Sequence, residues 1–340
     1  MSIIALMKKN VHKIAIVRLS ALGDIINSAI VLQFIHQKYP HAQIEWITEE
    51  VFAPLLKTHP LVHKVHTINL KKLKKEKKFS LLQETLSHLR SLGHFDIIID
   101  MQGLLKSAIV ARLIGKNTHG FDKNSSRESL SALLYKSSSF IPYTQNVIKR
   151  NCFLVADGLD FVIDDTMILG KEPIFGSLET FKFHHDEKNI AIVIGASWPS
   201  KKYPKELVVE LCNKLEANIF LIWGNEAEKE EAEFIVKNCA HATLAPKLSL
   251  HELVSYISQM DLLIGNDTGP THIAWAQNIP SITLFGPTTT RMMYETPINR
   301  GIKSPSKVNL LKIDKNDFSI KDIKVEEIVK TAKELLADGI

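Results

Sequence analysis

The chain has 340 residues, of which 45% are hydrophobic and 23% are charged, and its formal net charge is +5. This length and composition exclude a disordered protein and predict sizeable hydrophobic cores, which suits two domains better than one. No window approaches about 18 uninterrupted apolar residues and the first residues lack the pattern of a signal peptide, so we expect a cytoplasmic protein.

Short apolar runs alternate with helical patterns through the first half of the chain. The expected strands are residues 13–18, 43–47, 64–68 and 96–100. The expected helices are residues 25–38, 80–91 and 104–114. This alternation predicts a parallel sheet with helices on both faces. Residues 164–188 show no sustained periodicity and are the best candidate for a linker.

A second alternating set follows this linker. Its expected strands are residues 189–194, 219–223, 261–264 and 281–285. Its expected helices are residues 205–215, 227–236, 250–258 and 271–276, with a terminal amphipathic helix at about 320–336. We therefore predict an α/β protein of two Rossmann-like domains that face each other, residues 1–176 and 177–340.

The charge is distributed unevenly between these two parts. Residues 1–176 carry a net charge of +8, whereas residues 177–340 carry −3. A basic half can serve nucleic acid, an anionic membrane or a small polyanion, and charge alone does not choose among them. Because the basic half contains no recognised nucleic-acid-binding motif, we do not expect a nucleic-acid partner.

The turn after the first expected strand has the sequence RLSALGD, which ends at Asp24. It contains one glycine where a dinucleotide-binding fingerprint has three, which disfavours an ordinary NAD site. Asp24 stands where the next helix begins and can simply cap it. A carboxylate at the end of a first strand can equally act as a general base, kept ionised by the helix N-terminus. The sequence leaves both interpretations open.

The most informative motif is GNDTGPTH, residues 265–272. An apolar run, a polar turn and a helical pattern predict a strand, a tight turn and a helix start at the carboxyl edge of a parallel sheet, where α/β folds bind ligands. The backbone N–H groups of Thr268 and Gly269 would point at an anion, and a phosphate is the natural ligand. The alternative is that Asp267 and Thr268 only cap the helix. That alternative leaves His272 unexplained.

Two further strand ends carry polar side chains. In ASWPSKKYP, residues 196–204, the ammonium of Lys201 can neutralise a phosphate and Ser197 can donate a hydrogen bond, whereas a solvated turn position suits Lys202. In WGNEAE, Glu228 can accept hydrogen bonds from ribose hydroxyl groups. A first-turn glutamate favoured by the helix dipole is the equal alternative for Glu228.

The order and spacing of these motifs, together with DMQGLLKSA, SRESLSALLY and LFGPT, make residues 13–311 resemble bacterial lipopolysaccharide heptosyltransferases. The resemblance implies a GT-B fold with the active site between the two domains. It further implies an inverting enzyme that uses ADP-L-glycero-β-D-manno-heptose, with no cofactor and no metal. DMQGLLKSA and SRESLSALLY are similar to the type that adds the first heptose to the Kdo of Kdo-lipid A. The alternative is the type II enzyme, which adds heptose to a heptosyl acceptor.

The same resemblance assigns roles to individual residues. Asp24 would deprotonate the Kdo hydroxyl group. The donor would be bound by Ser197, Lys201, Glu228, Leu248, Asp267, Thr268, Gly269 and His272. Leu248 stands where relatives often place an adenine-contacting methionine.

The acceptor would be bound in the basic half, which would also contact the anionic cytoplasmic face of the inner membrane. The acceptor candidates are Lys71, Lys72, Lys74, Lys75, Gln102, Lys106, Arg127 and Arg150. Relatives carry arginines where this chain has the lysine run 71–78, and lysine binds phosphate as a point charge without the arginine fork. Without the resemblance, the lysine run is best interpreted as a solvated helix or loop face.

Overall fold

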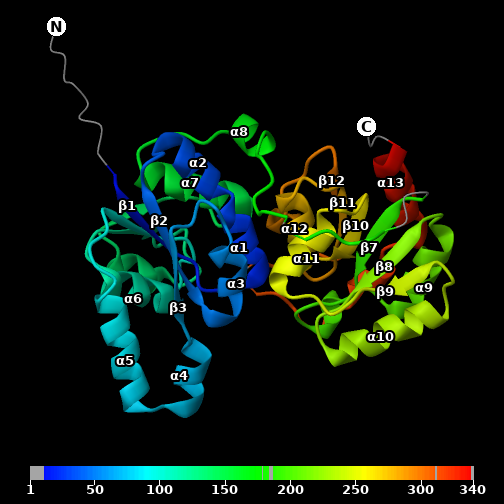
Figure 1. The fold of residues 1–340 in the computed structure, drawn as a ribbon, viewed down its shortest axis with the longest axis horizontal. Helices are drawn as coiled ribbons and strands as arrows, with labels where there is room; N and C mark the ends of the chain where they lie inside the picture. The colour runs from blue at the N-terminus through cyan, green and yellow to red at the C-terminus, as the bar shows by residue number, and fades with distance from the viewer. Residues whose placement is uncertain (1–10, 178, 184–186, 311, 338–340) are drawn as a thin grey trace, which may run out of the picture. The chain divides into compact units, whose positions relative to one another are not determined.

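The computed structural model describes residues 11–177, 179–183, 187–310 and 312–337 (Figure 1). The prediction that the chain lacks a signal peptide concerns residues 1–10, which lie outside the described residues. Residues 178 and 184–186 of the expected linker also lie outside them. The described chain forms two compact units that exchange segments along the sequence. Unit 1 contains the described residues up to Ser20, then Val31–Tyr143 and Phe153–Ile163. Unit 2 contains Ala21–Ile30, Thr144–Cys152 and the described residues from Asp164 onwards.

The two compact units do not divide the chain at a single point, because Ala21–Ile30 and Thr144–Cys152 belong to unit 2. The predicted domain boundary at residue 176 stays a prediction.

Unit 1 is built on a parallel sheet of six strands in the order β3-β2-β1-β4-β5-β6. The strands are β1 (Lys13–Val17), β2 (Gln43–Glu49), β3 (Lys64–Ile68), β4 (Ile97–Asp100), β5 (Thr118–Phe121) and β6 (Ser137–Ser139). β4 is buried at every position, as expected when both faces of a parallel sheet are covered. The four predicted strands are confirmed. Strands β5 and β6 were not predicted, because they are short and poor in apolar residues.

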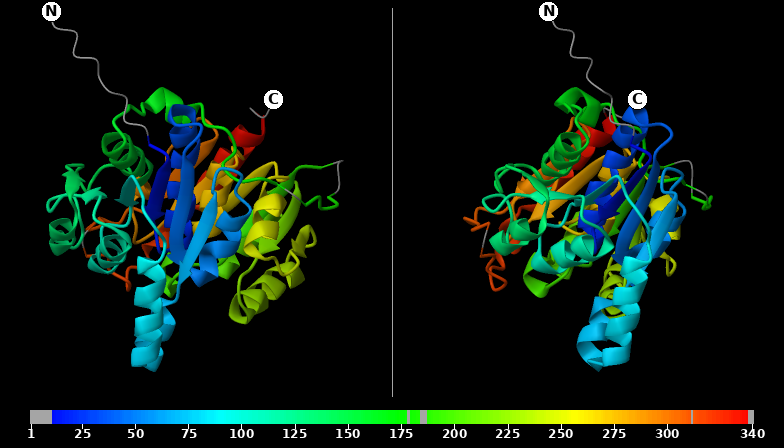
Figure 2. Two further views of the ribbon diagram at one scale, coloured as in Figure 1. Left: turned by 60° about the vertical axis from the view of Figure 1, so that its left-hand side comes forward. Right: turned by 90° about the vertical axis from the view of Figure 1, so that its left-hand side faces the viewer.

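The helices of unit 1 differ in how much of them is buried. They are α2 (Val31–Lys38), α3 (Ala53–Lys57), α4 (Leu70–Glu76), α5 (Phe79–Arg90), α6 (Leu105–Ile114) and the second half of α7 (Val147–Gly158), with the 3₁₀ turns η1 (Glu50–Phe52) and η2 (Ser129–Leu134). Val110 and Ala111 of α6 join the core formed by β1, β2 and β4. In contrast, α4 buries no residue and α5 buries only Leu89. These two helices extend beyond the sheet of unit 1 (Figure 2).

Unit 2 contains a second parallel six-stranded sheet, in the order β12-β11-β10-β7-β8-β9. Its strands are β7 (Asn189–Val193), β8 (Asn218–Ile222), β9 (Ala242–Leu244), β10 (Leu262–Asn266), β11 (Ser281–Phe285) and β12 (Asn299–Lys303). The strand order reverses between β7 and β10, and such a switch point is where open α/β sheets bind ligands.

The helices of unit 2 come from all parts of the sequence. They are α1 (Leu22–Ala29), the first half of α7, α8 (Asp165–Leu169), α9 (Lys205–Lys214), α10 (Glu226–Lys237), α11 (Leu250–Ile257), α12 (Gly269–Ala276) and α13 (Val325–Ala337), with η3 (Pro199–Lys201), η4 (Thr290–Met292) and η5 (Ser319–Asp322). The single helix predicted over 25–38 is wrong, because α1 ends at Ala29 and α2 begins at Val31. The predicted terminal helix is likewise divided into η5 and α13. The expected linker contains α8, which is capped by the Asp164 carboxylate.

Candidate active site

A buried charge cluster lies where β10 passes into α12 at the carboxyl edge of the unit 2 sheet. Asp267 is 3% exposed, and its two carboxylate oxygens contact different basic side chains. Oδ2 lies 2.8 Å from Nζ of Lys201, and Oδ1 lies 3.2 Å from Nε2 of His272. Lys201 comes from η3, which follows β7, so the cluster joins the two strands at the switch point. The structure thereby brings together three predicted donor residues.

Electrostatics within this cluster keep the carboxylate charged. Burial by itself raises the pKa of Asp267, but the adjacent Lys201 and His272 together hold that pKa well below its usual range. The ammonium of Lys201 therefore already has a carboxylate partner inside the protein. The donor-binding roles of these residues stay predictions.

The alternative that Asp267 and Thr268 only cap α12 is wrong. The backbone of Thr268 occupies the N-cap position, but its side chain makes no capping hydrogen bond. Its Oγ1 is buried without a hydrogen-bond partner among the described residues. The first turn of α12 begins at Gly269, and N–H groups of a first turn have no partner within their own helix. A buried hydroxyl and the start of α12 therefore lie next to the charge cluster.

Helix α1 packs against α12 through two glycines. A Cβ on Gly23 would lie 2.6 Å from Cδ2 of His272, and a Cβ on Gly269 would lie 2.6 Å from Cδ2 of Leu22. Because real Cβ contacts are longer, only glycine permits this close approach. The packing places Asp24, which belongs to α1, on the helix beside the one that carries His272.

Asp24 is the third residue of α1 rather than its N-cap. Its Oδ2 accepts a hydrogen bond from the backbone N–H of Ala21 at 3.2 Å, so it does satisfy one donor at the helix start. The side chain is half-buried. Asp24 thus helps to cap α1 from within its first turn. Its role as general base stays a prediction. By packing, Asp24 belongs to the same unit as the donor candidates.

Glu228 folds back towards the end of β7. Its Oε2 accepts a hydrogen bond from Gly224 N at 2.7 Å, and a Cβ on Gly195 would lie 2.7 Å from its carboxyl atoms. The backbone N–H of Glu228 is capped by Asn225 at 3.1 Å. Glu228 can therefore be a first-turn residue that the helix dipole favours and also place its carboxylate at the edge of the sheet.

Other donor candidates surround this turn. The loop before α11 carries the half-buried Leu248 and is tied to the Glu228 turn, because Nε1 of Trp223 donates to Ala245 O at 2.8 Å. Ser197 is exposed in the loop after β7. Lys202 pairs with Glu231 at 2.5 Å on the partly exposed surface, in keeping with the solvated position expected for it.

In unit 1, the turns after β1 and β4 are joined by hydrogen bonds. Oε1 of Gln102 accepts from Leu19 N at 2.9 Å, and its Nε2 donates to Oγ of Ser20 at 3.4 Å. Lys106 Nζ also donates to Ser20 Oγ, at 3.4 Å, and lies 3.9 Å from Glu49 Oε1. The structure therefore brings the acceptor candidates Gln102 and Lys106 together.

The residue that orders this turn, Asp100, is not among the predicted site residues. Asp100 is completely buried; its Oδ1 accepts from Gln102 N at 2.9 Å and its Oδ2 accepts from the Tyr135 hydroxyl at 2.7 Å. Burial raises the pKa of Asp100, partly opposed by these hydrogen bonds. The available signal was a carboxylate that directly follows an apolar strand. Asp100 positions Gln102 rather than facing solvent itself.

The remaining acceptor candidates are spread over several elements. Lys71, Lys72, Lys74 and Lys75 are exposed on α4, which matches the solvated-face alternative and leaves acceptor binding untested. Arg127 is exposed in the segment before η2. Arg150 is only 5% exposed in α7 and belongs to unit 2, unlike the other acceptor candidates.

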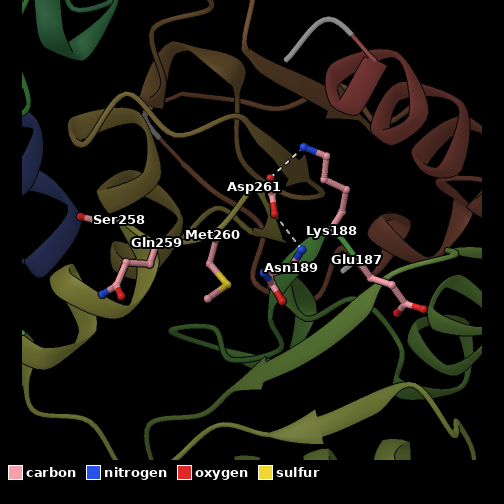
Figure 3. Close-up of a pocket in the computed structure, with 7 residues that line it drawn as sticks. All are labelled: Glu187, Lys188, Asn189, Ser258, Gln259, Met260 and Asp261. Carbon is pink, nitrogen blue, oxygen red and sulfur yellow. Dashed lines mark hydrogen bonds and ion pairs between the residues drawn. The ribbon is translucent and has the colours of Figure 1, made fainter. Parts of the chain in front are cut away.

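A separate hollow lies at the amino ends of β7 and β10 (Figure 3). It has a volume of about 480 Å³ and is lined by Glu187, Lys188, Asn189, Ser258, Gln259, Met260 and Asp261. Asp261 binds Lys188 Nζ at 2.9 Å and Asn189 N at 2.8 Å. None of the predicted site residues lines this hollow, so we do not assign the donor to it.

No group of three or more His, Cys, Asp or Glu side chains among the described residues is arranged to hold a metal ion. None of the described helices has the length and apolar character needed to span a membrane.

Comparison with known proteins decides the family. The model of Glycosyltransferase family 9 (heptosyltransferase) matches residues 85–316, about two thirds of the chain. The chain belongs to glycosyltransferase family 9. This family 9 glycosyltransferase is 40% identical to lipopolysaccharide heptosyltransferase 1 of Campylobacter coli over 96% of this chain and 99% of that protein. It is 28% identical to lipopolysaccharide heptosyltransferase 1 of Pseudomonas aeruginosa, over 81% and 79% of the two chains.

A solved structure supports the predicted architecture. Escherichia coli heptosyltransferase WaaC with ADP-2-deoxy-2-fluoro heptose superposes with a TM-score of 0.78 at 23% identity, covering 95% of this chain and 99% of that chain. At this identity the likeness concerns the fold alone. The predicted GT-B fold and the predicted resemblance to heptosyltransferases are confirmed.

Proposed function

We propose that this family 9 enzyme transfers L-glycero-D-manno-heptose from ADP-heptose to the Kdo of Kdo-lipid A, in the lipopolysaccharide inner core. The observation that carries the proposal is the cluster of Lys201, Asp267 and His272 beside the start of α12, with Asp24 on the helix packed against it. Two relatives named lipopolysaccharide heptosyltransferase 1, at 40% and 28% identity, favour Kdo over a heptosyl acceptor.

The donor diphosphate fits the start of α12 chemically. First-turn N–H groups and the positive end of the helix dipole favour an anion there. The buried hydroxyl of Thr268 can donate to a phosphate oxygen, and Lys201 supplies a fixed positive charge nearby. Glu228 and the loop of Leu248, which follow β8 and β9, would bind the ribose and the adenine.

The reaction needs a base opposite the leaving group. In the proposed step, Asp24 accepts the proton of the acceptor hydroxyl while the hydroxyl oxygen bonds to the anomeric carbon of heptose. The bond between that carbon and the diphosphate oxygen breaks, its electron pair leaves with ADP, and the configuration inverts. Donors fixed around the diphosphate stabilise the negative charge that develops on it, which lowers the barrier without reorganisation.

The proposal expects no metal and no cofactor, because cationic side chains and helix N–H groups would neutralise the departing diphosphate. On the acceptor side, Gln102, Lys106 and Arg127 in unit 1, together with the lysines of α4, would bind the anionic groups of Kdo-lipid A. The acceptor would be reached at the cytoplasmic face of the inner membrane.

Release of ADP from ADP-heptose in the presence of defined acceptors tests this proposal. We expect rapid release with Kdo-lipid A and little with an acceptor that already carries the first heptose, in the presence or absence of a chelator. Preference for the heptosyl acceptor would replace the proposal by the type II activity. Loss of activity on chelation would refute the metal-independent mechanism.

A further inference from the structure

Helix α1 is anchored near its carboxyl end as well as at its glycine contact with α12. Asn151, on the part of α7 that belongs to unit 2, is 1% exposed. Its Nδ2 donates hydrogen bonds to Asn27 O at 3.3 Å and to Ser28 Oγ at 3.1 Å. The Ser28 hydroxyl in turn donates to Asp24 O at 2.7 Å. A chain of hydrogen bonds therefore runs from α7 to the backbone of Asp24.

Asn151 supplies a donor that α1 does not have in its own last turn. The last four carbonyl groups of an α-helix have no N–H partner within that helix, and Asn27 O is one of them, because α1 ends at Ala29. The last turn of α1 also contains no basic side chain. The amide of Asn151 thus caps the carboxyl end of α1 from a different helix.

A second amide joins α1 to the loop after β11. Asn27 is completely buried, and its Nδ2 donates to Met292 O of η4 at 3.0 Å. Asn146, just before α7, donates from its Nδ2 to the next carbonyl, Met293 O, at 2.5 Å. Three asparagine side chains, Asn27, Asn146 and Asn151, therefore connect α1, α7 and η4 within unit 2. We call these three residues the asparagine bracket.

Stability alone does not account for Asn27. Its Oδ1 is buried without a hydrogen-bond partner among the described residues. The desolvation of an unpaired oxygen offsets the hydrogen bond that the nitrogen of the same amide makes, so this side chain returns little net stability. What the amide provides is direction, because its nitrogen fixes α1 relative to η4.

We propose that Asn151 is a positioning residue for the reaction, and that the asparagine bracket holds the carboxylate of Asp24 in register with the donor site. The proposal rests on the proposed function, in which Asp24 is the base. Helix α1 touches α12 at Gly23, one residue before Asp24, and is capped by Asn151 at its other end. Two such anchors determine both the position and the rotation of the helix. The base and the donor-binding residues of α12 are thereby held within one unit.

Asn151→Asp tests the proposal, because it preserves shape and replaces the donating amide by an oxygen that faces Asn27 O. We expect kcat to fall about 10- to 100-fold, since a displacement of about 1 Å can cost a factor of about 10². The KM for ADP-heptose and the Kd for ADP should stay within about twofold. A general loss of structure would change all three quantities.

A double variant shows whether Asn151 acts through Asp24. Asp24→Asn/Asn151→Asp should be less than about twofold slower than Asp24→Asn alone, because a base that is already absent cannot be misplaced. If Asn151 affected turnover by any other route, its effect would multiply with that of Asp24→Asn.

A matched control lies on β12. Asn299 is 2% exposed, and its Nδ2 likewise donates to one backbone carbonyl and one serine hydroxyl, Ile279 O at 2.8 Å and Ser281 Oγ at 2.9 Å. Asn299→Asp should lower the melting temperature by several degrees, as Asn151→Asp should, because both remove buried donors. Its kcat should stay within about twofold of the unsubstituted chain.

Amide hydrogen exchange tests the bracket without any acceptor. The amides of α1 should exchange about tenfold faster or more in Asn151→Asp, and should be unaffected in Asn299→Asp. If Asn151→Asp does not fold, Ser28→Ala removes only the hydroxyl that links Asn151 to Asp24 O. That variant should lower kcat about threefold or more and leave the Kd for ADP unchanged.

Three results would overturn the positioning role. They are normal kcat in a folded Asn151→Asp variant, losses that multiply in the double variant, and an equal loss of kcat in Asn299→Asp. Near-normal turnover of Asp24→Asn would instead show that the base of the proposed function is wrong, even if exchange in α1 still depends on Asn151. If only a heptosyl acceptor accepts heptose, the proposed acceptor is wrong, and the same ratios of kcat with that acceptor decide the role of Asn151.

Discussion

Substitution Lys201→Ala should destabilise the protein as well as weaken donor binding. It removes one partner of a 2.8 Å ion pair in which Lys201 is 7% exposed and Asp267 is 3% exposed. Removing one partner of such a buried pair costs about 3–5 kcal/mol, because the remaining charge is left in a desolvated site. For a folded unit of this size, the melting temperature should fall by roughly 10 °C.

The neighbouring lysine provides a matched control. Lys202 pairs with Glu231 at the partly exposed surface, where a salt bridge contributes about 1 kcal/mol or less. Lys202→Ala should therefore change both stability and ADP affinity little. In contrast, Lys201→Ala should weaken binding of ADP and of ADP-heptose in parallel, since the two ligands share the diphosphate.

The stability deficit of Lys201→Ala should depend on pH. In the unsubstituted chain the pKa of Asp267 is lowered on folding, so its contribution is present above the ordinary pKa of about 4 and is lost as pH falls through the lower folded value. In the variant, burial acts with one cation fewer and the aspartate gains a proton more readily. The difference in free energy of unfolding should thus shrink on acidification.

Chemical denaturation at several pH values and calorimetry with ADP measure these effects. Equal destabilisation by Lys201→Ala and Lys202→Ala would refute the buried-pair account. Normal ADP affinity in a folded Lys201→Ala variant would remove this lysine from the donor site. A variant with normal stability but weak ADP binding would mean that Asp267 does not depend on Lys201.

Three further predictions concern other parts of the molecule. Asp24→Asn should lower turnover by about 10² to 10⁴ while ADP affinity stays unchanged, and near-normal turnover at saturating substrates would exclude the general base. Gly195→Ala should displace the carboxylate of Glu228, whose atoms lie 2.7 Å from the added Cβ, and weaken ADP binding by about tenfold; unchanged calorimetry would separate Glu228 from the ribose. Burial lowers the pKa of His66, against the opposing effect of Glu45, so the free energy of unfolding should fall as pH drops below about 6.5. Denaturation of His66→Gln should show a shallower pH dependence, and an unchanged slope would contradict the assignment.

The sequence predicted the fold well where apolar periodicity is strong. The bounds of β3 and β11 agree with the predicted ranges, because both strands are rich in β-branched residues and each is followed by a turn residue, Asn69 after β3 and Gly286 after β11. Strand β6 consists of three serines, so its pairing with β5 arises from backbone hydrogen bonds that no side-chain pattern announces. The break between α1 and α2 also leaves no signal, since the apolar stripe continues through it.

The sequence indicated which residues are candidates for the site, but not which of them contact one another. Motif position indicated Lys201, Asp267 and His272, yet only the folded geometry shows that they bind one another. The sequence equally concealed Asp100, since its hydrogen bond to the Tyr135 hydroxyl joins residues 35 positions apart. Long-range pairing of this kind depends on strand order, which local patterns do not specify.

The exchange of segments between the two units has a consequence for recombination among relatives. A chimera joined near residue 176 would take α1 from one parent and α12 from the other, although the two helices pack with Gly23 against His272 and Gly269 against Leu22. Parents that differ at these four positions should yield hybrids with a damaged active site even when each sheet is intact. A hybrid that takes residues 21–30 from the same parent as its C-terminal half would keep the matched surface. The parts of unit 2 are therefore encoded by separate stretches of the gene.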